Sequence, residues 1–567
     1  MTKRYLISGI LVLTLAACAN PLDVSNLNDP DRTRVFSNPQ DLQVFIAGLY
    51  AVAHQANLGG SNDGLQTQMA AMSMENVSGL ANFAMGPRSA LPRNPITNQR
   101  GSQGNVGNYH DWFRGHRAAR QAALGFAALD NVFLGTAAAQ ARARLFCRFV
   151  QGVALGNLSL AYDSASILTE ADNPEADAGV VVALSGYRAV NTAALAYLDS
   201  AIALANANPT AFPFPVTANY WINGIGVTQA QFIQIARSYK ARFRASVART
   251  PAERADTSVT GGIVAWSEVI ADANAGITAN FDPQMDRLNG WDLSWYAQHH
   301  VSAAWHQMSQ FWLGMADTSG AYAAYLANTV PSTRTQMLIV TPDRRFPQGT
   351  TRSAQNTASP PSAGQPFLNT PYFRNRPSGS DIAGDPLQVS MYDFWRGRQF
   401  QQALRVGRYP VMTAAEIRLL AAEGYLRIAA PNFTEAITRI NVSRQAIGIL
   451  PALNAVTDTV AVAASGGNAC VPKVPDAAQS FRGTRCGNIW DALKWEYRLE
   501  TAYTGYGNWF FAGRGWGDLP QYTATQWPVP YNEMDARSEA FYGFGGPGGV
   551  SGAAPGNYGL FAPGGLY

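Results

Sequence analysis

Apolar residues recur every three to four positions through much of the first half of this chain. After Pro39 they fall at i, i+3, i+4, i+7 and i+8 from Leu42 to Ala53, the pattern of an amphipathic helix. The same period predicts helices at 112–129, 137–162, 184–205, 229–249 and 263–273. Helices of this length, rich in Ala, Leu, Tyr and Phe, favour stacked hairpins of tetratricopeptide type, although no clean repeat of ~34 residues is present.

The helical period fades in two stretches. Residues 57–107 are rich in Gly, Asn and Ser and predict a long surface loop. Prolines, glycines and aromatics are dense over 281–397, which favours a loop-rich, ligand-facing insertion. Helical patterns resume at 413–427, 432–448 and 489–503. The glycine-rich end, 543–567, has little capacity to bury a core.

The N-terminal residues have the pattern of an export signal. Lys3 and Arg4 precede an apolar run from Tyr5 to Leu15, which is too short to cross a bilayer as a helix. The run ends in Leu15-Ala-Ala-Cys18. An ordinary secretory signal with a chance cysteine is the alternative interpretation.

This N-terminal pattern resembles a bacterial lipobox. The resemblance implies that residues 1–17 are removed and that Cys18 carries acyl chains that hold the protein at a membrane. Ala19 stands where an Asp would favour retention at the inner membrane, so the outer membrane is expected. Beyond Cys18 no apolar stretch approaches the ~20 residues of a spanning helix.

Composition narrows the functional classes. Charged residues make up 14% of the chain, against about 25% in typical globular proteins. The net charge is only +4 over 567 residues, and no Lys/Arg-rich run interleaved with aromatics is present. Nucleic-acid binding is therefore not expected.

The four cysteines have separate predicted roles. Cys18 is assigned to lipid, and Cys147 lies in an apolar helical run, where a buried thiol is expected. Cys470 and Cys486 flank a segment with two prolines, and in an exported protein they predict a disulfide. Closing a loop of about 15 residues would contribute roughly 3 kcal/mol. Zinc is a poor alternative, because neither cysteine has a second ligand nearby.

A series of motifs follows one order along the chain. They are Asp23–Pro30, Pro342–Pro347, Ala414–Glu423, Glu435–Arg444 with Gly448, Trp495–Glu500 with Gly505, Trp509–Phe511, Arg514–Leu519 and Trp527–Glu533. Together they resemble the SusD/RagB-like nutrient-binding lipoproteins of bacterial outer membranes. The resemblance is thin over 57–107 and 281–400. Thr504 stands where that family usually has a second acid, which predicts an altered charge network there.

The resemblance implies a function as well as a fold. The protein would be a lipid-anchored, non-enzymatic protein of the outer membrane, without a cofactor and facing the cell surface. It would capture an oligosaccharide, or a peptide, and pass it to a SusC-like TonB-dependent transporter.

We therefore expect a mainly α protein, in which tetratricopeptide-like stacked helical hairpins form one large body with a loop-rich, ligand-facing insertion. The predicted parts are a lipoprotein signal peptide at 1–17, an anchor and tether at 18–40, a helical-repeat scaffold at 41–280, the aromatic ligand-facing region at 281–400, a C-terminal helical part at 401–542 and a glycine-rich tail at 543–567.

Catalytic and metal sites are poorly supported. Glu496 and Glu500 share one helical face but alternate with Lys494 and Arg498, which is typical of structural ion pairs rather than of the paired carboxylates of a glycosidase. On a helix His299 and His306 would lie about 10.5 Å apart, too far to share one zinc ion.

Crowded aromatics give the stronger functional indication. Trp291, Trp295, Tyr296, Trp305 and Trp312 lie close together in sequence, among Asn and Gln residues. Sugar rings pack on exposed aromatic faces while their hydroxyls bind amide and carboxylate groups. We predict that some of these five residues contact a ligand, although core packing is the commoner role for any single one. If they do not, the loop from Asn82 to Tyr109 is the next candidate.

Three functional hypotheses remain open from sequence: a nutrient-binding lipoprotein, a helical scaffold that binds only protein, and a secreted hydrolase. The first is favoured. Ligand titration separates them, because only the first binds a small ligand without turning it over.

Overall fold

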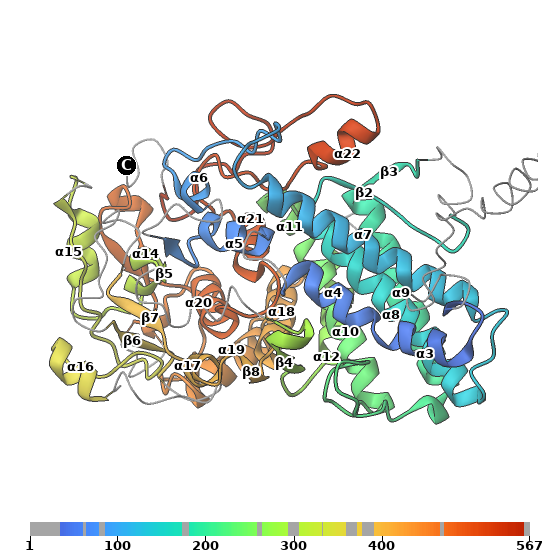
Figure 1. Ribbon diagram of the computed structural model, residues 1–567. Helices are drawn as coiled ribbons and strands as arrows, with labels where there is room; N and C mark the ends of the chain where they lie inside the picture. Colours follow the sequence, from blue (N-terminus) through green and yellow to red (C-terminus); the bar gives the residue numbers. More distant parts are fainter. Residues whose placement is uncertain are drawn as a thin grey trace, which may run out of the picture.

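The computed structural model describes residues 35–59, 64–78, 85–172, 181–257, 263–292, 306–330, 333–358, 371–376, 390–464 and 470–560. Helices dominate (Figure 1). Those of the N-terminal half are α3 (Pro39–Ala47), α4 (Leu49–Asn57), α5 (Leu65–Met72), α6 (Met85–Ser89), α7 (Asn105–Ala128), α8 (Ala137–Ala161), α9 (Tyr187–Ala207), α10 (Gln229–Ser246), α11 (Pro251–Ala255) and α12 (Trp266–Asn274).

The second half contains shorter helices and small sheets. Its helices are α14 (Gln310–Gly314), α15 (Ala321–Ala327), α16 (Arg352–Ala358), α17 (Arg398–Gln402), α18 (Ala414–Arg427), α19 (Phe433–Ala446), α20 (Ile489–Thr501), α21 (Asn508–Trp516) and α22 (Tyr531–Ala536). Short 3-10 turns are η2 (Pro209–Ala211), η3 (Arg287–Asn289), η5 (Val462–Ala464) and η6 (Ala477–Gln479).

All strands of the described residues pair two by two and antiparallel. The pairs are β1 (Val77–Ser78) with β5 (His306–Gln307), β2 (Ser164–Ser166) with β3 (Leu184–Gly186), β4 (Gln284–Asp286) with β8 (Val406–Arg408), β6 (Phe373–Asn375) with β7 (Tyr392–Phe394), and β9 (Lys473–Pro475) with β10 (Thr484–Cys486).

The long helices α7 to α10 form a layer in which α8 is central (Figure 1). Every residue of α8 from Phe149 to Ala161 is buried, between α7, α9 and α10. Local signals begin these helices: Thr136 caps α8, and Thr228 with Gln231 forms a capping box on α10. The helices predicted at 112–129, 137–162, 184–205 and 229–249 are thereby confirmed.

Two N-terminal predictions need correction. The helix expected from Leu42 to Ala53 is two helices, α3 and α4, which meet at Gly48. The stretch 57–107 is not simply a surface loop, because every residue of α5 is buried. A helix buried on all sides shows no alternation of polar and apolar faces, so its sequence carries no helical period.

Helices α18 to α21 pack into the middle of the molecule (Figure 1). α18 lies against α10 and α12. Its Glu416 and Glu423 form buried ion pairs with Arg242 of α10 at 2.6 Å and with Arg254 of α11 at 2.7 Å. Each pair joins residues about 170 positions apart. The N-terminal helical layer and the C-terminal helices therefore share one interior.

The glycine-rich tail also differs from its prediction. Phe544, Tyr558 and Leu560 are buried against the body, and the backbone of Phe544 pairs with that of Ile96.

None of the helices in the described part of the chain combines the length and the apolar character that a membrane span needs. The predicted fold class, mainly α with stacked helical hairpins, is confirmed.

Candidate ligand-binding site

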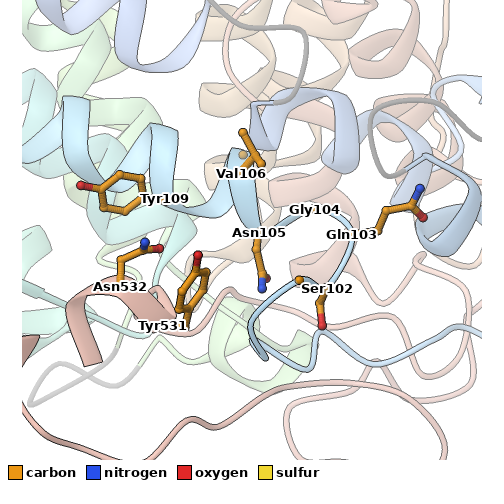
Figure 2. Close-up of a pocket in the computed structure, with 10 residues that line it drawn as sticks. Ser102, Gln103, Gly104, Asn105, Val106, Tyr109, Tyr531 and Asn532 are labelled. Atoms are coloured by element: carbon orange, nitrogen blue, oxygen red, sulfur yellow. The ribbon is translucent and has the colours of Figure 1, made fainter. Parts of the chain in front are cut away.

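An open pocket of about 510 Å³ lies where the N-terminus of α7 meets α22. Its walls are neutral: one comes from the loop before α7 and the first turns of that helix, the other from the start of α22 (Figure 2). The lining residues are Gly101, Ser102, Gln103, Gly104, Asn105, Val106, Gly107, Tyr109, Tyr531 and Asn532.

Glycines shape the wall before α7. Gly101 and Gly104 have φ of 77° and 94°, a left-handed conformation that costs little only for glycine. Gly104 is the N-cap of α7 and, as a glycine, has no side chain that could cap the first amides of the helix. The first amides of a helix lack partners within it, so the backbone at Val106 and Gly107 offers hydrogen-bond donors at the pocket wall.

Asn98 holds the two walls together. It is fully buried, and its Nδ2 donates to the Val529 carbonyl at 2.7 Å. Its Oδ1 accepts from the backbone amide of Tyr531 at 3.0 Å and from Asn108 Nδ2 at 3.4 Å. The pocket is therefore formed before any ligand arrives, which reduces the entropy lost on binding.

An outer contact connects the loop to α22 and to the segment that follows this helix. Arg100 pairs with Asp535 at 2.7 Å, with the two side chains 68% and 36% exposed. Its guanidinium carbon also lies 5.5 Å from the centre of the Phe541 ring. An ion pair this exposed contributes little to stability, so we assign the positioning of the walls to Asn98.

Two exposed aromatic rings continue from the pocket along α7. Tyr109 and Phe113 are 39% and 48% exposed, and their rings stack with centroids 5.7 Å apart. Val106 is 67% exposed and lies one turn before Tyr109. Apolar faces beside neutral amides and hydroxyls suit a ligand with both C–H faces and hydroxyl groups.

The structure places two of the predicted aromatic residues elsewhere. Trp291 is fully buried, with its ring 5.8 Å from Tyr50 and 5.1 Å from His54. Trp312 is 2% exposed and donates from Nε1 to the Ser73 carbonyl. Neither ring presents a face to a ligand, so we replace the ligand-binding prediction for these two with a core role.

The other predicted aromatics, Trp295, Tyr296 and Trp305, lie outside the described residues, and their ligand contact stays a prediction. The pocket instead lies in the second region that the sequence indicated, at the end of the stretch before Tyr109. Tyr531 and Asn532 were missed as site residues. Their sequence signal is that they lie in Trp527–Glu533, one of the motifs that resemble the SusD/RagB-like family, to which no ligand contact was assigned.

The carboxylates weighed as catalytic acids belong to a buried ionic cluster. Arg345, fully buried, donates to Glu496 at 2.5 Å and lies 3.5 Å from Glu500 and 2.7 Å from Asp343. Burial raises the pKa of Glu496, and Arg345 opposes this shift. Lys494 and Arg498 pair with Asp518 instead, at 2.8 and 2.5 Å. The cluster therefore holds α20 in place.

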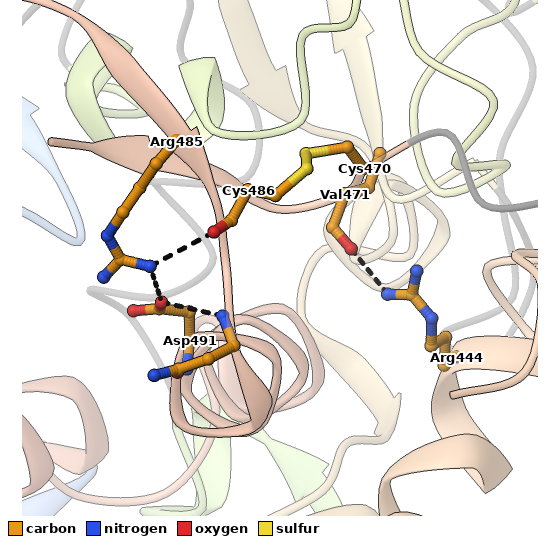
Figure 3. The surroundings of a disulfide bond; sticks show 7 residues. Arg444, Cys470, Val471, Arg485, Cys486 and Asp491 are labelled. Carbon is orange, nitrogen blue, oxygen red and sulfur yellow. Dashed lines mark hydrogen bonds and ion pairs between the residues drawn. A yellow bond between two sulfur atoms is a disulfide. The ribbon is translucent and has the colours of Figure 1, made fainter. Parts of the chain in front are cut away.

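The predicted disulfide between Cys470 and Cys486 is confirmed (Figure 3). The two Cα atoms are 5.5 Å apart, and the bond links the segment just before β9 to the last residue of β10. Beside it Arg485 pairs with Asp491 at 2.9 Å, and Arg444 donates to the Val471 carbonyl at 2.7 Å. Cys147 is buried and free, and burial raises its pKa far above the usual range of a thiol.

Other sequence predictions fall partly outside the structure. Cys18, His299 and His300 are not among the described residues. Within the described ranges no group of three or more His, Cys, Asp or Glu side chains could hold a metal ion.

Comparison with known proteins identifies the fold. No protein-family model and no curated protein matches the chain. Solved structures do match. A SusD superfamily protein from Parabacteroides distasonis has a TM-score of 0.53 and 10% identity over 88% of this chain and 97% of its own, and one from Bacteroides thetaiotaomicron has a TM-score of 0.52 and 10% identity over 89% of this chain and 99% of its own. A SusD-like protein from Bacteroides fragilis has a TM-score of 0.50 and 14% identity over 90% of this chain and 98% of its own. At these identities the similarity establishes architecture. The chain has the SusD-like fold.

Proposed function

We propose that this protein captures oligosaccharides at the pocket between α7 and α22. The observation that carries the proposal is the combination of a neutral, preformed pocket of about 510 Å³ with the exposed Tyr109–Phe113 pair beside it. Carbohydrates need this combination, because their rings have apolar C–H faces and their hydroxyl groups need neutral donors and acceptors.

The lining disfavours ligands that carry formal charge. None of the ten lining residues is charged, and the nearby Arg100 is already paired with Asp535. A bound phosphate or a peptide terminus would lose its hydration without gaining a counter-ion. A neutral glycan has no such cost.

We further propose that the protein acts from the outer membrane, held by lipid at Cys18, and delivers its ligand to a SusC-like TonB-dependent transporter. The lipobox-like sequence before Cys18 and the ordered motifs of the C-terminal third support this. Replacing Cys18 with Ser is expected to release the protein from the membrane fraction. An unmodified Cys18 in the mass spectrum of membrane-extracted wild-type protein would contradict the anchoring.

Titration of the protein from residue 20 onward against panels of glycans and peptides tests the function. We expect heat of binding with at least one oligosaccharide and unchanged ligand recovered afterwards. Cleavage of the ligand would instead favour the secreted hydrolase. Failure of every glycan and peptide to bind would favour a scaffold that binds only protein.

A further inference from the structure

A second pocket, of about 210 Å³, lies on another face of the molecule. It is bounded by the first half of α10, the loop before it, the segment from Ile277 to Asp282 and Arg408 of β8. In Figure 1, β8 and α12 lie at the lower edge and α22 at the upper edge. This second pocket is therefore separate from the candidate glycan site.

The floor of the second pocket is apolar and mostly buried. Val227, Ile235, Ile277 and Phe281 are each at least nine-tenths buried, and Ile225 is half-buried beside them. Such a floor accepts a branched aliphatic or aromatic group.

Backbone hydrogen bonds hold the wall of the second pocket in place. The amide of Phe281 donates to the Met412 carbonyl at 2.9 Å, and its carbonyl accepts from Val411 at 2.9 Å. Asn280 Oδ1 accepts from the amide of Ala414 at 3.0 Å. The pocket is thus present before binding, and its shape can select a ligand.

The rim carries one positive and one negative group side by side. Arg408 Nη1 lies 3.6 Å from Asp282 Oδ1, and the two side chains are 49% and 35% exposed. A pair this long and exposed contributes little to stability, so a ligand can replace it at small cost. Burial raises the pKa of Asp282, which indicates that Arg408 compensates the carboxylate incompletely.

We propose that this second pocket binds a free α-amino acid with a branched aliphatic or aromatic side chain. The ammonium group lies against Asp282, the carboxylate against Arg408, and the side chain on the apolar floor. An α-amino acid carries an ammonium group and a carboxylate group on the same carbon. These two neighbouring charges match the Asp282 carboxylate and the Arg408 guanidinium, which lie 3.6 Å apart. Gln231, Gln234 and Thr278 add neutral hydrogen-bonding groups at the wall.

The size of the pocket supports a single amino acid. Its volume is below the ~300–1,000 Å³ typical of pockets for drug-sized ligands, which disfavours an oligosaccharide of several residues. An internal peptide residue lacks both charges, so a peptide segment would leave the two rim groups unused. The proposal does not depend on glycan binding.

Titration of the same protein with L-leucine and L-phenylalanine tests the proposal. We expect at least one to bind, and N-acetyl-L-leucine and L-leucinamide, which each lack one charge, to bind about tenfold more weakly than L-leucine. Asp282→Asn and Arg408→Gln should each weaken binding of the free amino acid about tenfold. Asp130→Asn, at an exposed pair elsewhere, should not.

Three results would overturn the proposal. The first is that neither amino acid binds the wild-type protein. The second is that a derivative lacking one charge binds as tightly as L-leucine. The third is that folded Asp282→Asn and Arg408→Gln both retain wild-type affinity. Tyr109→Ala is expected to keep amino-acid binding, which separates this pocket from the glycan site.

Discussion

At the scale of single residues, burial decides which aromatic side chains can meet a ligand. Trp291 and Tyr109 both occur in polar sequence, yet the first is fully buried and the second is 39% exposed. The sequence shows that aromatics are crowded but not which faces the fold leaves open. The sequence could therefore narrow the candidate site only to two stretches, the aromatic region at 281–400 and the loop from Asn82 to Tyr109.

Trp291→Ala is expected to lower the free energy of unfolding by about 3–5 kcal/mol, because it removes a large ring from the core. Urea denaturation measures this. Phe113→Ala, at a ring that is 48% exposed, is the control and should change stability by less than about 0.5 kcal/mol. A Trp291→Ala protein as stable as the wild type would show that the ring does not belong to the core.

Glu75 gives a pH-dependent prediction. It is 5% exposed, accepts a hydrogen bond from the Tyr503 amide at 2.6 Å, and burial raises its pKa to about 8. Between pH 4.5 and 8 the unfolded chain loses this proton while the folded chain keeps it. Stability therefore falls as pH rises through this range, by up to about 1.4 kcal/mol per pH unit from this group.

Glu75→Gln removes the titration and keeps an acceptor for the Tyr503 amide. The variant should be more stable than the wild type at pH 8, and the difference should shrink on acidification to pH 4. Denaturation at a series of pH values checks this. A difference that is constant with pH would mean that Glu75 titrates normally in the folded protein.

At the scale of elements, amphipathic helices are predictable and the remaining elements are not. Helices α7 and α9 and the first halves of α8 and α10 each bury one face, so their period appears in the sequence. α5 is buried on all sides and has no period, while the break between α3 and α4 needs only one glycine. Phe544, Tyr558 and Leu560 are isolated among glycines, and only the folded body explains their burial.

Gly156 tests the close packing of α8 on α10. A Cβ atom at this position would overlap the Phe243 ring. Alanine favours a helix over glycine by about 1 kcal/mol, yet we expect Gly156→Ala to destabilise the protein by about 1–3 kcal/mol, because the core is overpacked. Gly186→Ala, with open space around its Cβ, is the control. A stabilised Gly156→Ala would show that the helices are less closely packed.

At the scale of the whole molecule, the fold joins distant segments through buried polar contacts. Asn98 bonds to Val529 and Tyr531, and α10 and α11 pair with α18 through arginines. Local periodicity does not reveal such pairings, because the partners are about 170 residues apart in the ion pairs and more than 400 apart in the Asn98 contacts. The stacked helices were therefore predictable, but the wall that α22 contributes to the pocket was not.

The Arg254–Glu423 pair tests this connection. Burial works to raise the pKa of Glu423, but Arg254 and Arg427 outweigh it and lower the pKa to about 2. Glu423→Gln leaves buried cations without a counter-ion and should cost about 3–5 kcal/mol at pH 7. This contribution is present above pH 4.5 and is lost as pH falls toward 2.

Glu435→Gln is the matched control, since the Glu435 side chain is 44% exposed in its pair with Arg439 within α19 and its replacement should cost less than about 0.5 kcal/mol. Denaturant titration at pH 7 and pH 3 compares the two variants. Equal effects at pH 7, or an effect of Glu423→Gln that does not decrease at pH 3, would contradict the assigned role of the pair.

The central claim is that the pocket beside α7 binds glycans through its aromatic face, and calorimetric titration of Tyr109→Ala tests it most directly. The ligand is the oligosaccharide that binds the wild-type protein best. Phe133→Ala is the control, because Phe133 is 59% exposed and lies beyond the opposite end of α7. We expect Tyr109→Ala to weaken binding by about 1–3 kcal/mol and Phe133→Ala to leave it unchanged. A folded Tyr109→Ala protein with wild-type affinity would contradict the claim.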